Sequence, residues 1–283
     1  MRQLTVISGK GGTGKTTITA AFASMAKNAV FADCDCDAPD LQLILKPKVV
    51  GKEEYIGSAV AIKKTNCSKC GKCREVCRFG AIDNEIKIIK AKCEGCGACA
   101  FVCPENAIEM KKEKTGTIYR SLTRFGPLIH AELRIGEEAS GKLVNRVRKK
   151  AKELASGEGL IIIDGSPGIG CPVISSITGV DAVLVVAEPT VTGIYDMERA
   201  LEVAEHFEIP AMVCINKHNI NKEKTKEIEE FCRTRGVPVV GKLPYDDVAT
   251  RAMINEQTVI EYSNSELSKS LKEIWGKIES TLS

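Results

Sequence analysis

The sequence predicts an α/β fold with a doubly wound, mostly parallel sheet, interrupted by one small α+β insert. Short apolar runs alternate with helical stretches along most of the 283-residue chain, and such alternation is typical of a parallel sheet with helices on both faces. Between residues 60 and 112 the alternation stops, and eight of the chain's 13 cysteines fall there. We therefore expect one large domain, residues 1–59 and 113–283, and an inserted domain, residues 60–112.

Composition limits the partners of the chain. Hydrophobic residues make up 43% and charged residues 27%, and the net charge is only +3. A chain of this length buries a sizeable core, whereas a nucleic-acid binder usually carries a clustered basic excess. The short basic run at residues 146–150 lies in a helical pattern and is expected to be a solvated helix face. We expect no nucleic-acid partner.

The start of the chain and its hydropathy indicate a cytoplasmic protein. Met1 leads directly into an apolar strand pattern without the features of a signal peptide. No apolar run approaches the roughly 18 residues that a membrane span requires. Cytosolic thiols stay reduced, so the many cysteines favour a metal site over disulfides.

A glycine-rich loop follows the first expected strand, residues 4–8. Its sequence, Gly-Lys-Gly-Gly-Thr-Gly-Lys-Thr-Thr over residues 9–17, satisfies the pattern G-x-x-x-x-G-K-[ST], and residues 16–28 are expected to be helical. In this context backbone N–H groups surround phosphate oxygens, the lysine reaches the β- and γ-phosphates, and the next hydroxyl binds Mg²⁺. The alternative is a glycine-rich turn without a ligand. The expected contacts are Gly9, Gly11, Gly12, Thr13, Gly14, Lys15, Thr16 and Thr17, with Thr16 also at the Mg²⁺.

Carboxylates follow two further apolar strands. Residues 29–32 lead into Asp33 and Asp35, and residues 160–163 lead into Asp164. The carboxyl ends of parallel strands meet at the ligand edge of a sheet, so these side chains should lie near the phosphates. Asp164 is expected in the water shell of the Mg²⁺, and the glycines after it permit a loop that moves when the γ-phosphate leaves.

Lys10 makes the glycine-rich loop unusual. Together with Gly-Gly-Thr-Gly-Lys-Thr-Thr it resembles the deviant Walker A motif of the MinD/ParA family of ATPases, which includes the nitrogenase iron protein. The resemblance implies a nucleotide-dependent homodimer in which Lys10 reaches the phosphate of the partner's ATP, so Lys10 and Lys15 would both be catalytic. The alternative for Lys10 is a flexible surface lysine. The resemblance also implies that Asp35 orients the attacking water and that Asp33 belongs to the outer shell of the Mg²⁺.

Residues 211–219 resemble a base-recognition loop. GTPases place an aspartate at the fourth position of Asn-Lys-x-Asp, where its carboxylate accepts two hydrogen bonds from guanine, but here that position is Asn219. This difference disfavours guanine, and the family resemblance implies that Asn216 contacts adenine. Residues 243–246 resemble the second adenine loop, with Pro244 as the contact, although a plain β-turn explains them equally well.

Two runs of four cysteines share one spacing. The runs are Cys67, Cys70, Cys73, Cys77 and Cys93, Cys96, Cys99, Cys103. This is the bacterial two-cluster ferredoxin pattern. The second run has the proline that usually follows the last cysteine, whereas the first run has Arg78 at that position. In that pattern three cysteines of one run and the fourth of the other hold each cluster. The expected sets are Cys67, Cys70, Cys73 with Cys103, and Cys93, Cys96, Cys99 with Cys77.

The insert is therefore expected to be a small bacterial-ferredoxin-like domain with two [4Fe-4S] clusters. The alternative is zinc, but zinc modules place longer loops between their cysteine pairs and often use histidine. Residues 67–103 contain no histidine. Outside the insert, Cys214 and Cys232 are expected to be packing residues. Cys171 is expected to be a small buried residue, with a cluster ligand, as in the nitrogenase iron protein, as the alternative.

Two other segments bear on the family. Residues 136–144 resemble a segment of MinD-type ATPases with inserted ferredoxin domains, and Ser140 or Lys142 there is expected to cap a helix. MinD itself ends in a membrane-binding amphipathic helix. The C-terminal stretch here, residues 265–282, mixes lysine and glutamate on its polar face, whereas a membrane helix would be rich in lysine. We expect it to pack on the core.

These features lead to three functional hypotheses. The first is an ATPase that couples its nucleotide state to electron transfer toward a redox partner, in the assembly or activation of another metalloprotein. The second is an ATP-dependent carrier of Fe–S clusters or metallocofactors. The third is a MinD-like positioning protein whose clusters sense redox state. A simple assembly scaffold is disfavoured, because such scaffolds carry an exposed Cys-x-x-Cys late in the chain, and only Cys214 and Cys232 follow Cys171.

Overall fold

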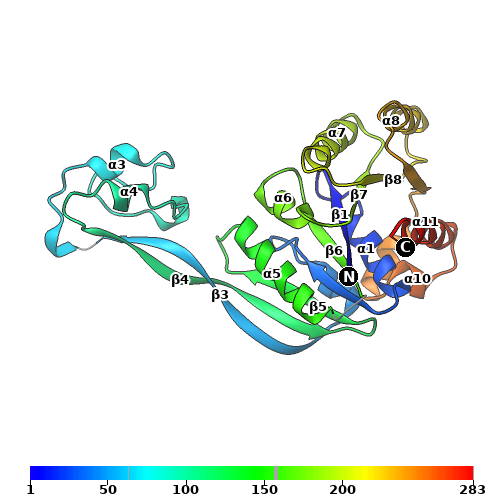
Figure 1. Ribbon diagram of the computed structural model, residues 1–283, viewed down its shortest axis with the longest axis horizontal. Coiled ribbons are helices and arrows are strands. Elements are labelled where there is room, and N and C mark those ends of the chain that lie inside the picture. The colour runs from blue at the N-terminus through cyan, green and yellow to red at the C-terminus, as the bar shows by residue number, and fades with distance from the viewer. Residues whose placement is uncertain (63, 156–158, 283) are drawn as a thin grey trace. The chain divides into compact units, whose positions relative to one another are not determined.

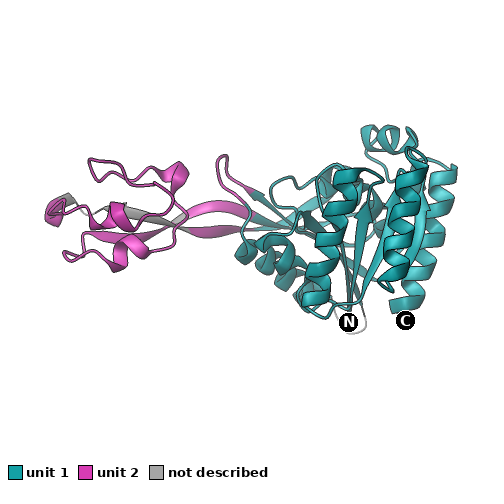
Figure 2. Cartoon of the chain, turned by 90° about the horizontal axis from the view of Figure 1, so that it is seen from above, with its two compact units in different colours: residues 1–52, 118–132, 139–283 teal, residues 53–117, 133–138 magenta. Residues whose placement is uncertain are grey.

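The computed structural model describes residues 1–62, 64–155 and 159–282. The chain divides into two compact units (Figure 2). Unit 1 comprises residues 1–52, 118–132 and 139–283, and unit 2 comprises residues 53–117 and 133–138. Two long strands, β3 (Lys48–Ile62) and β4 (Ile108–Leu122), continue from one unit into the other. Among the described residues, none of the helices combines the length and apolar character that crossing a membrane requires.

Unit 1 is built on a mostly parallel sheet, which confirms the α/β fold predicted for the large domain. The strand order is β3-β4-β5-β2-β6-β1-β7-β8-β9. Parallel pairs join β2 to β5 and β6, β1 to β6 and β7, and β8 to β7 and β9. The strands not yet given bounds are β1 (Arg2–Ser8), β2 (Ala29–Asp33), β5 (Pro127–Leu133), β6 (Leu160–Pro167), β7 (Ala182–Ala187), β8 (Ala211–Asn216) and β9 (Val239–Leu243).

Helices cover both faces of this sheet (Figure 1). Alternate β1 residues point to opposite sides: Leu4 and Val6 enter the core beneath α1 and α11, whereas the hydroxyl of Thr5 donates to the Ser176 carbonyl of α6 at 2.9 Å. The helices of unit 1 are α1 (Lys15–Met25), α2 (Leu41–Leu45), α5 (Gly141–Leu154), α6 (Cys171–Ile177), α7 (Val191–His206), α8 (Lys222–Thr234), α9 (Val248–Ile254), α10 (Val259–Tyr262) and α11 (Glu266–Leu282).

Two expectations about helices are confirmed. The apolar residues of α11, among them Leu271, Ile274 and Ile278, are buried in the core beside α1. The C-terminal helix therefore packs on unit 1. Ser140 caps α5, since its hydroxyl accepts a hydrogen bond from the Leu143 N–H at 3.3 Å, whereas Lys142 lies inside the helix.

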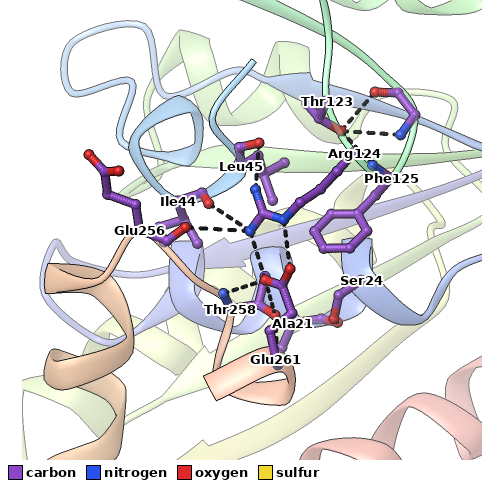
Figure 3. A network of polar contacts seen from close by, with 11 residues as sticks. Ala21, Ser24, Ile44, Leu45, Thr123, Arg124, Phe125, Glu256, Thr258 and Glu261 are labelled. Carbon is purple, nitrogen blue, oxygen red and sulfur yellow. Dashed lines mark hydrogen bonds and ion pairs between the residues drawn. The ribbon is translucent and has the colours of Figure 1, made fainter. Parts of the chain in front are cut away.

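The turn between β4 and β5 is fixed by Arg124 (Figure 3). Its guanidinium donates to the carbonyls of Leu45 at 2.8 Å and Ile44 at 3.1 Å, at the C-terminal end of α2, and pairs with Glu261 of α10 at 2.6 Å. Glu261 also completes a capping box with Thr258. A cation at the last carbonyls of a helix complements the helix dipole. Arg124 thus holds α2, which follows the acidic loop, against its neighbours.

Unit 2 is an internal repeat with matched backbone conformations. Its elements are the short helices α3 (Lys72–Val76) and α4 (Ala98–Phe101) and the single 3₁₀ turns η1 (Lys64–Asn66) and η2 (Lys90–Lys92). Gly71 and Gly97 precede α3 and α4 with φ of 82° and 79°, a left-handed conformation that favours glycine. Two further equivalent pairs, Lys69 with Gly95 and Gly80 with Asn106, also have positive φ. The repeated sequence therefore gives a repeated structure.

The apolar core of unit 2 is small. Its buried members are Cys73, Ile82, Ile86, Cys99 and Ile108. Other cysteines pack against this cluster, namely Cys67, Cys77, Cys93 and Cys103. Thiols thus form much of the interior of the unit.

Candidate nucleotide-binding site and cysteine cavities

The glycine-rich loop between β1 and α1 borders a cleft of about 580 Å³ at the carboxyl ends of the strands. Gly14 takes a left-handed conformation with φ of 91° and delivers Lys15 to the first turn of α1. A larger cavity, about 760 Å³, lies at the opposite ends of β7, β8 and β9, away from the predicted site residues. The predicted residues that line the cleft are Gly11, Gly12, Thr13, Gly14, Lys15, Thr16, Thr17, Asp35, Asn216 and Pro244.

Lys15 is buried between two carboxylates. Its Nζ lies 2.8 Å from Asp164 Oδ1 and 3.4 Å from Asp35 Oδ2. Burial alone would lower the pKa of Lys15, but the charges of Asp164 and Asp35 raise it above its ordinary value. The ammonium group therefore stays charged at the floor of the cleft, where phosphate oxygens would replace or join its carboxylate partners.

Asp164 and Thr16 form a set of hard oxygen donors. Asp164 is fully buried within β6, and its carboxylate accepts hydrogen bonds from Thr16 Oγ1 at 2.7 Å and Thr19 Oγ1 at 2.9 Å. Mg²⁺ is usually bound by one or two such groups together with substrate phosphates and waters. Within the described residues, no three carboxylate, thiolate or imidazole side chains converge on a position for a single metal ion. The donor set thus fits a Mg²⁺ that arrives with a nucleotide.

Asp33 and Asp35 follow β2 but have different surroundings. Asp33 is fully buried, and its carboxylate accepts from the Asp35 N–H at 3.1 Å and the Leu41 N–H at 3.2 Å. Burial, followed by the charge of Asp164, raises the pKa of Asp33 well above its ordinary range. Asp35 instead lines the cleft and faces Lys15. Asp35 is therefore placed to meet a ligand, whereas Asp33 shapes the loop before α2.

Lys10 contacts its own chain. Its Nζ lies 3.2 Å from Glu188 Oε2 and donates to Thr192 Oγ1 at 3.3 Å, near the start of α7. Glu188 also pairs with Lys217 at 2.7 Å, and Lys217 donates to the Gly12 carbonyl at 3.2 Å. Burial opposes ionisation, but hydrogen bonds from Lys217 and Lys10 lower the pKa of Glu188. The sequence did not predict a role for Glu188. The feature that could have indicated one is its position directly after an apolar strand.

The end of β8 and the residues after it contact the glycine-rich loop directly. Asn216 Nδ2 donates to the Thr13 carbonyl at 2.7 Å, and its Oδ1 accepts from the Lys217 N–H at 2.9 Å. Asn219 Oδ1 accepts from the Tyr245 N–H at 2.7 Å. Asn219 stands at the position where GTPases read guanine, and its acceptor oxygen already binds the backbone of the 243–246 loop. Tyr245, which the sequence places in this loop without a role of its own, lines the cleft beside Pro244 and is 56% exposed.

Three of the five cysteines of unit 1 bear on predictions from the sequence. Cys214 and Cys232 are fully buried, as predicted for packing residues. The expectation that Cys171 is buried is wrong, because this residue is exposed at the start of α6. A helix that begins directly after Gly170 leaves its first side chain outside the core.

The eight cysteines of unit 2 line two separate cavities. The first is lined by Cys67, Cys70, Cys73 and Cys103, and the second by Cys77, Cys93, Cys96 and Cys99. Each cavity thus combines three cysteines of one run with the fourth of the other, the grouping expected from the spacing. The fourth cysteine accepts a backbone hydrogen bond in both: Ala107 N–H to Cys103 Sγ at 3.2 Å and Ala81 N–H to Cys77 Sγ at 3.4 Å. Soft thiolates with N–H donors fit the ligation of an Fe–S cluster.

Comparison with known proteins agrees with the nucleotide cleft. The family model of the CobQ/CobB/MinD/ParA nucleotide binding domain matches residues 4–259. Two similar proteins come from Methanocaldococcus jannaschii. The uncharacterized protein MJ0578 is 35% identical over 98% of this chain and 96% of its own length. The uncharacterized ATP-binding protein MJ0547 is 25% identical over 97% of this chain and 86% of its own length.

Solved structures share the fold. The septum site-determining protein MinD from Pyrococcus horikoshii, complexed with Mg-ADP, superposes with a TM-score of 0.61 at 16% identity, covering 99% of this chain and 96% of that chain. The ATP complex of Cyanothece McdA(D38A) gives a TM-score of 0.62 at 16% identity, with the same coverage of both chains. At this identity the likeness establishes the architecture alone.

Proposed function

The chain belongs to the CobQ/CobB/MinD/ParA nucleotide-binding family, and from this premise we propose that it couples ATP binding and hydrolysis to electron transfer. Two [4Fe-4S] clusters in unit 2 would carry the electrons. The recipient would be a redox partner, in the assembly or activation of another metalloprotein. MinD and ParA members of the family are ATPases, and the chain is a P-loop ATPase of this kind.

The residues of the cleft have complementary roles in this proposal. Backbone N–H groups of the glycine-rich loop and the Lys15 ammonium bind the phosphates. Thr16 and Asp164 hold Mg²⁺, and Asp35, at the cleft wall, orients the attacking water. Lys10 leaves Glu188 and stabilises the transferred phosphate from the partner subunit of a homodimer. Asn216 and Pro244 both line the cleft, and in this proposal they contact adenine.

One observation carries the redox part of the proposal: two cavities in unit 2 each collect four cysteines from both runs. A zinc site would draw four ligands to about 2.3 Å from one point, whereas a cube is held at its corners around a cavity. A bound [4Fe-4S] cluster exchanges one electron without a change of ligands. We infer that residues 60–112 form the ferredoxin-like part of the chain.

The proposal is tested by anaerobic purification followed by metal analysis and EPR. We expect about eight irons and about eight sulfides per chain, and two reducible paramagnetic centres. Adding Mg-ATP should change the EPR signals or the rate at which an external acceptor oxidises the reduced protein, with Mg-ADP as the comparison. Zinc in place of iron would refute the cluster assignment. Iron without any effect of Mg-ATP would refute the coupling.

The carrier and positioning hypotheses predict other results. A carrier would deliver iron to an apo-protein on addition of ATP. A positioning protein, suggested by the shared MinD architecture, would bind lipid or polymerise with ATP. The apolar face of α11 is buried in unit 1, so this helix offers no free membrane-binding face, and we place electron transfer first.

A further inference from the structure

The two cysteine cavities form a natural pair for comparison, because the repeat gives them matched ligand environments. At equivalent positions the cysteines have the same exposure: Cys70 and Cys96 are exposed, and Cys73 and Cys99 are buried. Cys67, Cys77, Cys93 and Cys103 are all half-buried. Each cavity has one backbone N–H donor to its fourth thiol. Solvent exposure and sulfur hydrogen bonding, two influences on cluster potential, are therefore nearly equal at the two sites.

The charges that line the cavities are not equal. The charged residues that line the first cavity are Lys69, Lys72 and Glu105, which gives it a net charge of +1. The charged residue that lines the second cavity is Glu94, which gives it a net charge of −1. Lys92 and Arg78 adjoin ligands of the second site in the sequence, but neither lines its cavity. The difference arises within the repeat, where Gly95 and Ala98 stand at the positions of Lys69 and Lys72.

We propose that Lys69 and Lys72 raise the reduction potential of the first site, Cys67–Cys70–Cys73–Cys103, above that of the second. The inference rests on the proposed two-cluster function. Reduction adds one negative charge to a cluster, so nearby ammonium groups stabilise the reduced state and a carboxylate destabilises it. In the singly reduced protein the electron is consequently held at the first site. Both lysines are exposed, so salt should screen their effect.

Two variants exchange the charges while preserving the backbone. Lys69 has φ of 55°, which glycine adopts readily, and Lys72 is the first residue of α3, where alanine is a good helix former. The double variant Lys69→Gly, Lys72→Ala therefore copies the second repeat into the first. Glu94→Ser makes the opposite change, since serine occupies the equivalent position 68. Lys111→Ala, on an exposed residue of β4 outside both cavities, is the matched control for the loss of a positive charge.

The measurement is a potentiometric EPR titration of the full-length holoprotein at low salt, with iron content determined for each variant. We expect two one-electron midpoints in the wild type. The double lysine variant should lower the higher midpoint potential. At a fixed applied potential, the ratio of reduced to oxidised first site should fall at least threefold, which corresponds to a shift in midpoint of about 28 mV. Glu94→Ser should raise the lower midpoint, and Lys111→Ala should move neither comparably. Raising the salt concentration should narrow the wild-type gap.

Failure of this inference is distinct from failure of the proposed function. Coincident midpoints in a protein with about eight irons would overturn the inequality and leave the clusters in place. A double lysine variant that shifts the lower midpoint, or shifts no more than Lys111→Ala does, would also overturn it. Absence of iron would instead refute the proposed function itself.

Discussion

The two units of this chain use different interiors. Unit 1 has an extensive core of aliphatic and aromatic side chains, with Phe22 and Phe31 fully buried, and it also buries the ion pair between Lys15 and Asp164. Unit 2 has a small core in which Cys73 and Cys99 lie beside three isoleucines, and four further cysteines pack against it. A domain this small gains only marginal stability from apolar burial. Unit 1 should therefore fold by apolar burial, and unit 2 should depend on what its thiols bind.

Removing the proposed clusters should give the largest effect, and it tests this comparison directly. Treating the holoprotein anaerobically with an iron chelator and an oxidant should unfold residues 60–112 and leave unit 1 folded, because metal binding and folding are coupled in such small domains. Hydrogen exchange of the intact chain would show protection lost in unit 2 only, and Mg-ATP affinity should persist. Equal protection of residues 60–112 before and after iron removal would show that this unit needs no metal.

Replacing Lys15 should have the largest effect within unit 1. Lys15→Ala leaves the buried carboxylates of Asp164 and Asp35 without their cation, and breaking a buried pair costs about 3–5 kcal/mol. Urea denaturation should show this loss, and calorimetry should show no Mg-ATP binding. Lys142→Ala, on the exposed side of α5, is the control and should change neither. Wild-type stability in Lys15→Ala would contradict the view that Lys15 supplies the compensating charge for these carboxylates.

The sequence predicted the parts of both sites that depend on local motifs. The glycine-rich loop, Asp164 and the two groups of four cysteines follow from short spacings that the fold preserves. It did not predict β3, whose residues Val49 and Val50 are exposed and leave little alternation to detect. It also did not predict the partner of Lys10, because Glu188 is distant in sequence and its role arises only when β7 lies beside β1.

Lys10 tests whether unit 1 acts alone or as a pair. In its own chain Lys10 contacts Glu188 and α7, so Lys10→Ala should leave Mg-ATP affinity nearly unchanged. If the ammonium stabilises phosphoryl transfer in a partner subunit, kcat should fall on the order of 10³-fold, as for other cations supplied in trans. Steady-state ATPase assays over a range of protein concentrations would measure this fall. An unchanged kcat would mean that Lys10 has no catalytic role and is a surface lysine paired with Glu188.

The pH dependence of the Glu188 contacts is the smallest expected effect. Lys217 and Lys10 lower the folded-state pKa of Glu188 below its ordinary value of 4.5. A carboxylate with a depressed folded-state pKa stabilises the fold above its unfolded pKa, and this contribution is lost as the pH falls through the folded-state value. The difference in unfolding free energy between wild type and Glu188→Gln should be about 1 kcal/mol near neutral pH, and it should be lost as the pH falls through the folded-state pKa, which lies below 4.5. Urea denaturation across this range measures it, with Glu205→Gln on the exposed side of α7 as the control. A difference that stays constant with pH would mean that Glu188 stabilises unit 1 through packing and not through its charge. The stability of unit 1 would then depend less on this ion pair than on its apolar core.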